Sequence, residues 1–193
     1  MSAKDVEAFL VELSPEAPCG EDLAYDPEYA ELERAIQGTP EQQVGDKIIE
    51  AQDPNWRQVK TLCKNLFKRT KDLRVALYYT LAAMQLDGLP GLAEGLEVMY
   101  GLIEKYWGSF HPQLDADDNN DPMERMNIIG SLAPESSFQD PLKFPQHIIE
   151  TALVTSPQVG KFTMRHVLMA TGELKPVGDE KPTDPAMIDA AFG

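Results

Sequence analysis

The stretch DLRVALYYTLAAMQLD, residues 72–87, is apolar almost all the way round a helix. A helix at the surface of a globular protein carries apolar side chains on one face, whereas a helix that is apolar on every face lies in the interior. Gly88 follows directly and is a common helix terminator. The stretch therefore predicts one central, buried helix against which other helices pack.

The two neighbouring segments have the apolar spacing of ordinary amphipathic helices. In the preceding segment, 54–69, one face carries Trp56, Val59, Leu62, Cys63, Leu66 and Phe67. In the following segment, which begins at Pro90, the aligned apolar residues are Leu92, Leu96, Met99, Ile103 and Tyr106 or Trp107. Three glycines in that segment lower its helix propensity and would let a neighbouring helix approach closely: Gly91, Gly95 and Gly101.

Asp-Pro pairs mark several of the expected helix starts. The aspartate can accept hydrogen bonds from the free backbone amides, and the proline lacks an N–H that would stay unpaired there. Four such pairs precede apolar residues at helical spacing: Asp26-Pro27, Asp53-Pro54, Asp121-Pro122 and Asp184-Pro185. They predict helices at 27–37, 54–69, 122–133 and 185–192, the third with Met126, Ile129 and Leu132 facing inward.

The remaining segments are shorter or less regular. Ser2 and Asp5 resemble a capping box for a helix at 3–13, whose inward residues are Val6, Phe9, Leu10 and Leu13. Residues 39–52 indicate a polar loop with a short extended piece at Ile48-Ile49. Residues 147–155 fit a strand or a helix, and 163–171 indicate a short helix.

These segments together predict an all-α (mainly α) fold, a multi-helix bundle with an irregular C-terminal segment. We expect one helical domain at 1–172. Residues 173–193 indicate a linker and the start of a following helix, which we expect to be truncated.

The composition argues against several classes of function. The 193 residues include 17 Lys and Arg against 32 Asp and Glu, a formal charge of −15, and no basic stripe offsets it locally. Such a field repels nucleic acids and anionic membrane surfaces. No apolar run is long enough to cross a bilayer, so direct membrane insertion is not expected. Two cysteines without CxxC spacing, Cys19 and Cys63, fit the reducing cytoplasm.

The stretch YWGSFHPQLDADDNNDP, residues 106–122, raises the question of a metal site. Its acidic part, 115–121, crowds carboxylates and amides together, so a calcium-responsive helical domain is the alternative hypothesis for function. An EF-hand starting at Asp115 would need Gly and Glu where Asn120 and Met126 stand. A solvated connection between two helices explains the pattern better.

No catalytic motif accompanies these residues. His111, His147 and His166 lack the spacing of a zinc site, and no phosphate-binding glycine loop or nucleophile elbow is present. Cys19 could serve a thiol hydrolase only with a lowered pKa and a nearby base, and no sequence signature supplies them. We therefore expect no enzyme activity, no cofactor and no metal.

Three motifs together resemble a known family. They are P-x-G-E-D-L-x-Y-D-P at 18–27, K-D-L-R at 71–74 and Y-W-x-x-x-H-P-x-L-D at 106–115. The chain is similar over 13–133 to the ImpA-type N-terminal domain of TssA proteins of the bacterial type VI secretion system. The stretch VGKFTMRHVL, 159–168, extends the resemblance, although His166 stands where an aspartate is expected.

The resemblance implies a non-enzymatic, cytoplasmic assembly component that docks onto baseplate and tail sheath subunits during tail assembly. Its implied partners also include the inner tube and the membrane complex of the apparatus. Self-association would occur mainly through a C-terminal region outside this sequence, because the C-terminal regions of the family form rings. As candidate partner contacts we take four residues of the stretch 106–122: His111, Asp115, Asp117 and Asp118.

Overall fold

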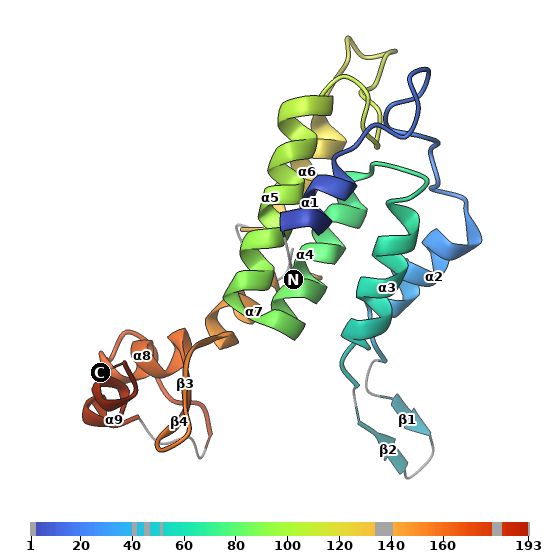
Figure 1. The fold of residues 1–193 in the computed structure, drawn as a ribbon. Helices are drawn as coiled ribbons and strands as arrows, with labels where there is room; N and C mark the ends of the chain where they lie inside the picture. The colour runs from blue at the N-terminus through green and yellow to red at the C-terminus, as the bar shows by residue number, and fades with distance from the viewer. Residues whose placement is uncertain are drawn as a thin grey trace. The chain divides into compact units, whose positions relative to one another are not determined.

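The predicted central helix is α4, Leu73–Asp87, and almost its whole circumference is buried. Asp72 caps it, because its Oδ1 accepts hydrogen bonds from the amides of Arg74 at 2.7 Å and Val75 at 3.3 Å. Gly88, with a φ of +69°, ends it in a conformation that L side chains rarely adopt. Helices α3 (Trp56–Leu66) and α5 (Leu89–Tyr106) pack against α4 (Figure 1).

The structure, a computed structural model, describes residues 3–39, 42–44, 47–50, 52–133, 141–178 and 183–192. The chain divides into two compact units, Met1–Leu142 and Lys143–Gly193. The domain expected at 1–172 stays a prediction, and residues 143–172 of it belong to the second compact unit.

Gly91 and Gly95 of α5 lie against α4, which agrees with the predicted close approach of a neighbouring helix. Gly95 sits so close that a Cβ added there would lie 2.5 Å from the Cα of Thr80. The buried residues of α5 are Gly91, Gly95, Val98, Met99, Gly101, Leu102 and Tyr106. The predicted inward face is thus right at Met99 and Tyr106, but Leu96, predicted to face inward as well, is exposed.

Two of the four Asp-Pro pairs cap helices as predicted, because the side chains of Asp26 and Asp184 each accept a hydrogen bond, at 2.9 Å, from the amide two residues later. Asp121 accepts one of the same length from the amide of Met123, but α6 begins only at Met123, with Pro122 in the cap position. The fourth pair is different: α3 begins two residues beyond Pro54 and is capped by Asn55, whose Oδ1 accepts from the amide of Gln58 at 3.3 Å. An asparagine caps a helix as well as an aspartate does.

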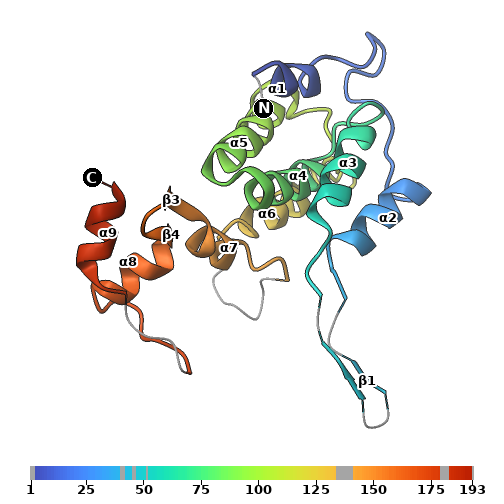
Figure 2. The same ribbon diagram turned by 60° about the horizontal axis from the view of Figure 1, so that its bottom comes forward.

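The other elements of the first unit surround these three helices. α1 (Ala3–Phe9) packs on α5 and ends earlier than predicted, and α2 (Pro27–Ala35) packs on α3. β1 (Gln42–Val44) and β2 (Lys47–Ile49) form an antiparallel hairpin that includes the predicted extended piece. The hairpin extends beyond the ends of α2 and α3 (Figures 1 and 2). α6 (Met123–Gly130) contacts α4.

The second unit is small but ordered around four buried apolar side chains, Phe144, Phe162, Met169 and Ile188. Its elements are α7 (Phe144–Glu150), the antiparallel strands β3 (Ala152–Ser156) and β4 (Gly160–Thr163), α8 (Met164–Ala170) and α9 (Pro185–Phe192). Residues 147–155 are thus helix and then strand, so each of the two interpretations holds for one half. His166 accepts a hydrogen bond from the amide of Thr163 at 3.1 Å and so caps α8 in place of an aspartate.

The mainly α class is confirmed. Two-stranded hairpins are the only sheets within the described ranges. Among the helices that the structure describes, none is both long and apolar enough to cross a membrane.

Candidate functional site

The three sequence motifs meet at one place in the first unit, through backbone hydrogen bonds. The amide of Lys71 donates to the carbonyl of Cys19 at 2.8 Å, and the amide of His111 donates to the carbonyl of Lys71 at 2.9 Å. The carbonyl of His111 in turn accepts from the amide of Leu73 at 2.7 Å. Segments far apart in the sequence therefore lie side by side, and they fix where α5 ends.

Gly20 is required at this meeting point. Its φ is +70°, and a Cβ there would lie 2.1 Å from the carbonyl oxygen of Arg69. The carbonyl oxygen of Gly20 lies 3.2 Å from Nε2 of His111. Any side chain at position 20 would separate the first motif from the second.

Buried charges hold the same place together. Lys71 is fully buried; its Nζ donates to the carbonyl of Phe9 at 2.8 Å and lies 5.9 Å from the ring centroid of Tyr106. Burial lowers the pKa of Lys71. Burial likewise raises the pKa of Asp72, to about 6, although Arg74 Nη2 lies 3.8 Å from its second oxygen.

Arg125 of α6 fixes the chain between α5 and α6. Its side chain is fully buried, and it donates to the carbonyls of Trp107, Phe110 and Pro112, the last two at 2.7 Å. The guanidinium carbon lies 3.9 Å from the ring centroid of Phe110, within range of a cation–π contact. A single arginine thus satisfies three carbonyls at the end of α5 with a planar fork of donors.

The acidic loop, residues 115–121, begins directly beyond this clamp. The Oδ1 atom of Asp115 accepts hydrogen bonds from the amides of Asp117 at 3.0 Å and Asp118 at 3.3 Å. Asn119 and Asn120 have φ values of 53° and 59°, a left-handed conformation that asparagine tolerates better than most residues. The amide of Asp115 also donates to the carbonyl of Asp121 at 3.2 Å, which closes the loop.

The structure separates the four residues predicted as partner contacts. Asp115, Asp117 and Asp118 are exposed together on the acidic loop, whereas His111 is buried and its ring meets Gly20. Exposed apolar side chains flank the loop along the chain on both sides: Tyr100 and Trp107 before it, Met123 and Met126 after it. Met126 was predicted to face inward, but Arg125 and Ile128 are the buried residues of α6.

The geometry of the described residues supports neither a metal site nor a nucleophilic Cys19. No three His, Cys, Asp or Glu side chains among them are placed to hold a metal ion. The thiol of Cys19 is buried, 3.2 Å from the hydroxyl of Ser109, and burial raises its pKa. A raised pKa disfavours the thiolate that a nucleophilic cysteine needs.

Sequence reasoning missed the full burial of Arg125 and Lys71. Lys71 lies in the K-D-L-R motif but has no local feature that predicts burial. Arg125 stands near Met123, Met126 and Ile128, and these apolar neighbours could have predicted its burial. A buried arginine needs hydrogen-bond acceptors, so contacts with carbonyl groups would have been expected as well.

Comparisons with known proteins agree over most of the chain. The family described as ImpA, N-terminal, type VI secretion system matches residues 10–134. A curated relative, the type VI secretion system component TssA1 of Pseudomonas aeruginosa, is 43% identical over 168 residues, 87% of this chain. The chain spans about half the length of that relative, 47%.

A solved structure has a similar fold. It is the N-terminal domain, including the conserved ImpA_N region, of the TssA component of the type VI secretion system from Burkholderia cenocepacia. The TM-score is 0.70, at 23% sequence identity, and the match covers 99% of this chain and 71% of that one.

Proposed function

Because this chain belongs to the TssA family of the bacterial type VI secretion system, through its ImpA N-terminal region, we propose that it is a non-enzymatic docking module. In this proposal it binds baseplate and tail sheath subunits during tail assembly, in the cytoplasm and without a cofactor. The inner tube and the membrane complex are further partners of the same apparatus.

The observation that carries the proposal is the ordered yet exposed acidic loop. Its backbone is held by its own hydrogen bonds, while the carboxylates of Asp117 and Asp118 face solvent. Arg125 holds the chain just ahead of the loop, at Pro112. A loop that is already ordered loses less conformational entropy on binding. Exposed carboxylates raise the rate and selectivity of encounter with a basic surface more than the final affinity.

The four predicted contacts have different roles in this proposal. Asp117 and Asp118 touch the partner, and Asp115 holds the turn that presents them. His111 acts indirectly, because its backbone and ring fix the chain ahead of the loop. The exposed Trp107 and Met126 supply apolar contact area beside the charges, as interfaces usually require.

Charge reversal in the loop tests the proposal. The double variant Asp117→Lys and Asp118→Lys leaves Asp115, and with it the turn, in place. We expect it to weaken binding to at least one purified baseplate or sheath subunit by about tenfold or more, since two favourable charges become repulsive. Biolayer interferometry against each subunit, at low and high salt, measures the change.

A matched control changes the same charge elsewhere. Glu7 and Glu16 are exposed and lie outside the loop, so Glu7→Lys with Glu16→Lys should leave binding unchanged. If the loop variant binds every subunit as tightly as the unaltered chain does, the acidic loop is not the docking surface. If both double variants weaken binding equally, net charge alone is responsible.

A further inference from the structure

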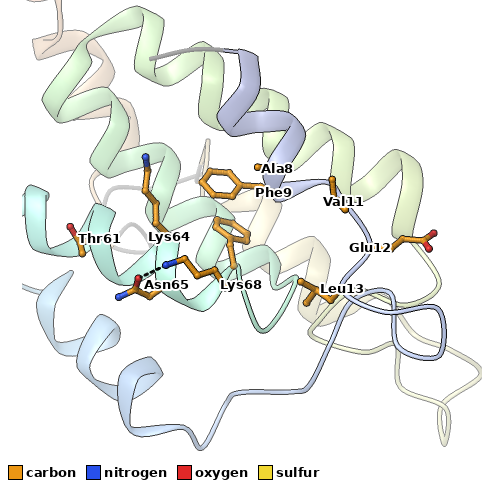
Figure 3. A pocket seen from close by; sticks show the side chains of 10 residues that line it. Ala8, Phe9, Val11, Glu12, Leu13, Thr61, Lys64, Asn65 and Lys68 are labelled. Atoms are coloured by element: carbon orange, nitrogen blue, oxygen red, sulfur yellow. Dashed lines mark hydrogen bonds between the residues drawn. The ribbon is translucent and has the colours of Figure 1, made fainter.

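A second surface of the first unit differs from the acidic loop in shape and charge. It contains a cavity of about 470 Å³ between the N-terminal segment and α3 (Figure 3). The rings of Phe9 and Phe67 are stacked, with centroids 4.7 Å apart, and Val11 and Leu13 add apolar walls. Its volume is within the range of ligand pockets, roughly 300–1,000 Å³.

Basic side chains border this apolar cavity. Lys64 comes from α3 and Lys68 from the turn that follows it, and Lys68 Nζ donates to Asn65 Oδ1 at 3.2 Å. Glu12 also lines the cavity, but it lies at the far end from Lys64, with its carboxylate directed away from both lysines (Figure 3). The border nearest α3 is therefore positive.

A second cavity, of about 400 Å³, continues along α3 and is lined by Arg57, Lys60, Thr61, Lys64, Leu86 and Asp87. Thr61 and Lys64 line both cavities, so the two adjoin. The carboxylate of Asp87 is bound by Lys60 Nζ at 2.5 Å. We call the two cavities together the α3 groove.

The groove corrects the expectation that no basic stripe offsets the acidic charge. Arg57, Lys60 and Lys64 are spaced three or four apart on α3, which puts them on one helix face, and Lys68 follows in the turn after the helix. These four basic residues line the groove together with two acidic ones, Glu12 and Asp87. The chain of charge −15 thus presents a locally basic surface here.

We propose that the α3 groove binds an acidic peptide segment that carries an apolar anchor residue. The anchor side chain enters the cavity beside Val11 and Leu13, and flanking carboxylates lie near Lys64, Lys68 and Arg57. Apolar burial supplies affinity, and the cations select the charge of the partner. This site does not depend on the acidic loop, which has the opposite charge.

The cavity fits a peptide better than a nucleic acid. Single-stranded nucleic acids bind by stacking bases on exposed aromatic faces, whereas Phe9 and Phe67 are 9% and 2% exposed. The overall charge of −15 also repels a phosphate backbone beyond the immediate groove. A short acidic peptide stays within the groove, so its carboxylates interact mainly with the Lys and Arg side chains there.

Fluorescence anisotropy with the full chain tests the proposal. The probe is a labelled synthetic peptide in which one Phe and one Leu, a helical turn apart, are flanked by Asp and Glu. Its comparisons are the same peptide with Lys for each acidic residue, the same peptide with Ala for both anchors, and an oligothymidylate. We expect the acidic anchored peptide to bind, the other three to bind at least about tenfold more weakly, and salt to weaken binding.

Variants assign the binding to the groove. We expect Lys64→Glu with Lys68→Glu, and separately Val11→Asp at an exposed wall position, to weaken binding by about tenfold. Lys64→Arg with Lys68→Arg should retain it, and Lys105→Glu, on the exposed part of α5, should not change it. Circular dichroism of each variant verifies that the fold is intact.

Several results would overturn the assignment. They are no binding of the acidic peptide, equal binding of the basic peptide or the oligothymidylate, or unchanged affinity in the Lys64→Glu, Lys68→Glu variant. Concentration-dependent self-association that the same variant abolishes would assign the groove to a second copy of the chain instead.

Discussion

Asp72 combines two roles that oppose each other at neutral pH. Its Oδ1 caps the central helix, which favours the ionised carboxylate, yet the side chain is almost fully buried, which disfavours it. Burial is the larger effect and raises the pKa to about 6 from an ordinary value of 3.8. The folded chain therefore binds this proton more tightly than the unfolded chain does.

This shift predicts a specific pH dependence. The stabilisation from protonated Asp72 is complete below about pH 4 and is lost as the pH rises through 6, because the folded-state pKa is the higher one. At about 1.4 kcal/mol per pKa unit, the loss reaches about 3 kcal/mol. Asp72→Asn keeps a capping oxygen without the charge, so its free energy of unfolding should gain about that amount relative to the unaltered chain between pH 4 and 7.

Urea denaturation across that pH range measures the difference. Asp26 is a matched control, because it also caps a helix, but its hydrogen bond with Arg69 lowers its pKa. Asp26→Asn should therefore change relative stability in the opposite direction as the pH rises. A constant difference between the Asp72→Asn and unaltered chains from pH 4 to 7 would contradict the prediction.

At the scale of elements, the sequence predicted the existence of the helices better than their orientation. α4 was predicted with its end at Gly88, and its burial followed because a helix that is apolar all round leaves no choice of face. For α5, the close approach of a neighbouring helix was predicted and occurs at Gly91 and Gly95. The inward face of α5 was predicted correctly at Met99 and wrongly at Leu96, because the packing of neighbouring elements decides which side chains are covered.

The candidate site was predictable only where it depends on residues that are neighbours in the sequence. The acidic loop and its capping aspartates could be read from local sequence, because turns and caps depend on neighbouring residues. The burial of His111, the carbonyl contacts of Arg125 and the basic α3 groove depend on residues far away in the chain. The hairpin β1–β2 was likewise expected only as one extended piece, since pairing is a non-local property.

The close contact between Gly95 of α5 and Thr80 of α4 predicts that one added methyl group lowers the stability of the fold. Gly95→Ala adds a Cβ within 2.5 Å of the Thr80 backbone, which cannot move cheaply. We expect the free energy of unfolding to fall by about 1–3 kcal/mol from overpacking, even though alanine has the higher helix propensity. Thermal and urea denaturation measure it.

Gly130 in α6 provides the matched comparison. Nothing lies within 4 Å of a Cβ at that position, so Gly130→Ala should be neutral or stabilising by up to about 1 kcal/mol. If both variants behave alike, helix propensity and not the contact between α4 and α5 controls stability at Gly95.

At the scale of the whole molecule, the two compact units suggest where the chain can be divided. The first unit, Met1–Leu142, contains α4 and all the helices that pack on it, as well as the acidic loop and the α3 groove. The family match at 10–134 lies entirely within it. Both proposed surfaces therefore belong to one unit with its own core.

A fragment of residues 1–142 should accordingly fold alone. We expect it to unfold cooperatively, to keep its helical circular dichroism and to bind the acidic peptide as tightly as the full chain does, since the groove residues are all present. Gradual melting with exposed apolar surface, detected by dye binding, would show that residues 143–193 are needed for the fold.

The Arg125 clamp has an evolutionary consequence. It fixes the chain at the end of α5, and Asp115 and Asp121 close the loop by a backbone hydrogen bond. The exposed side chains at 116–118 can therefore change without unfolding the domain, whereas Asn119 and Asn120 are restrained by their left-handed backbone. If the loop is the docking surface that we propose, the domain can follow a change in its partner by altering these few exposed positions while its interior stays the same.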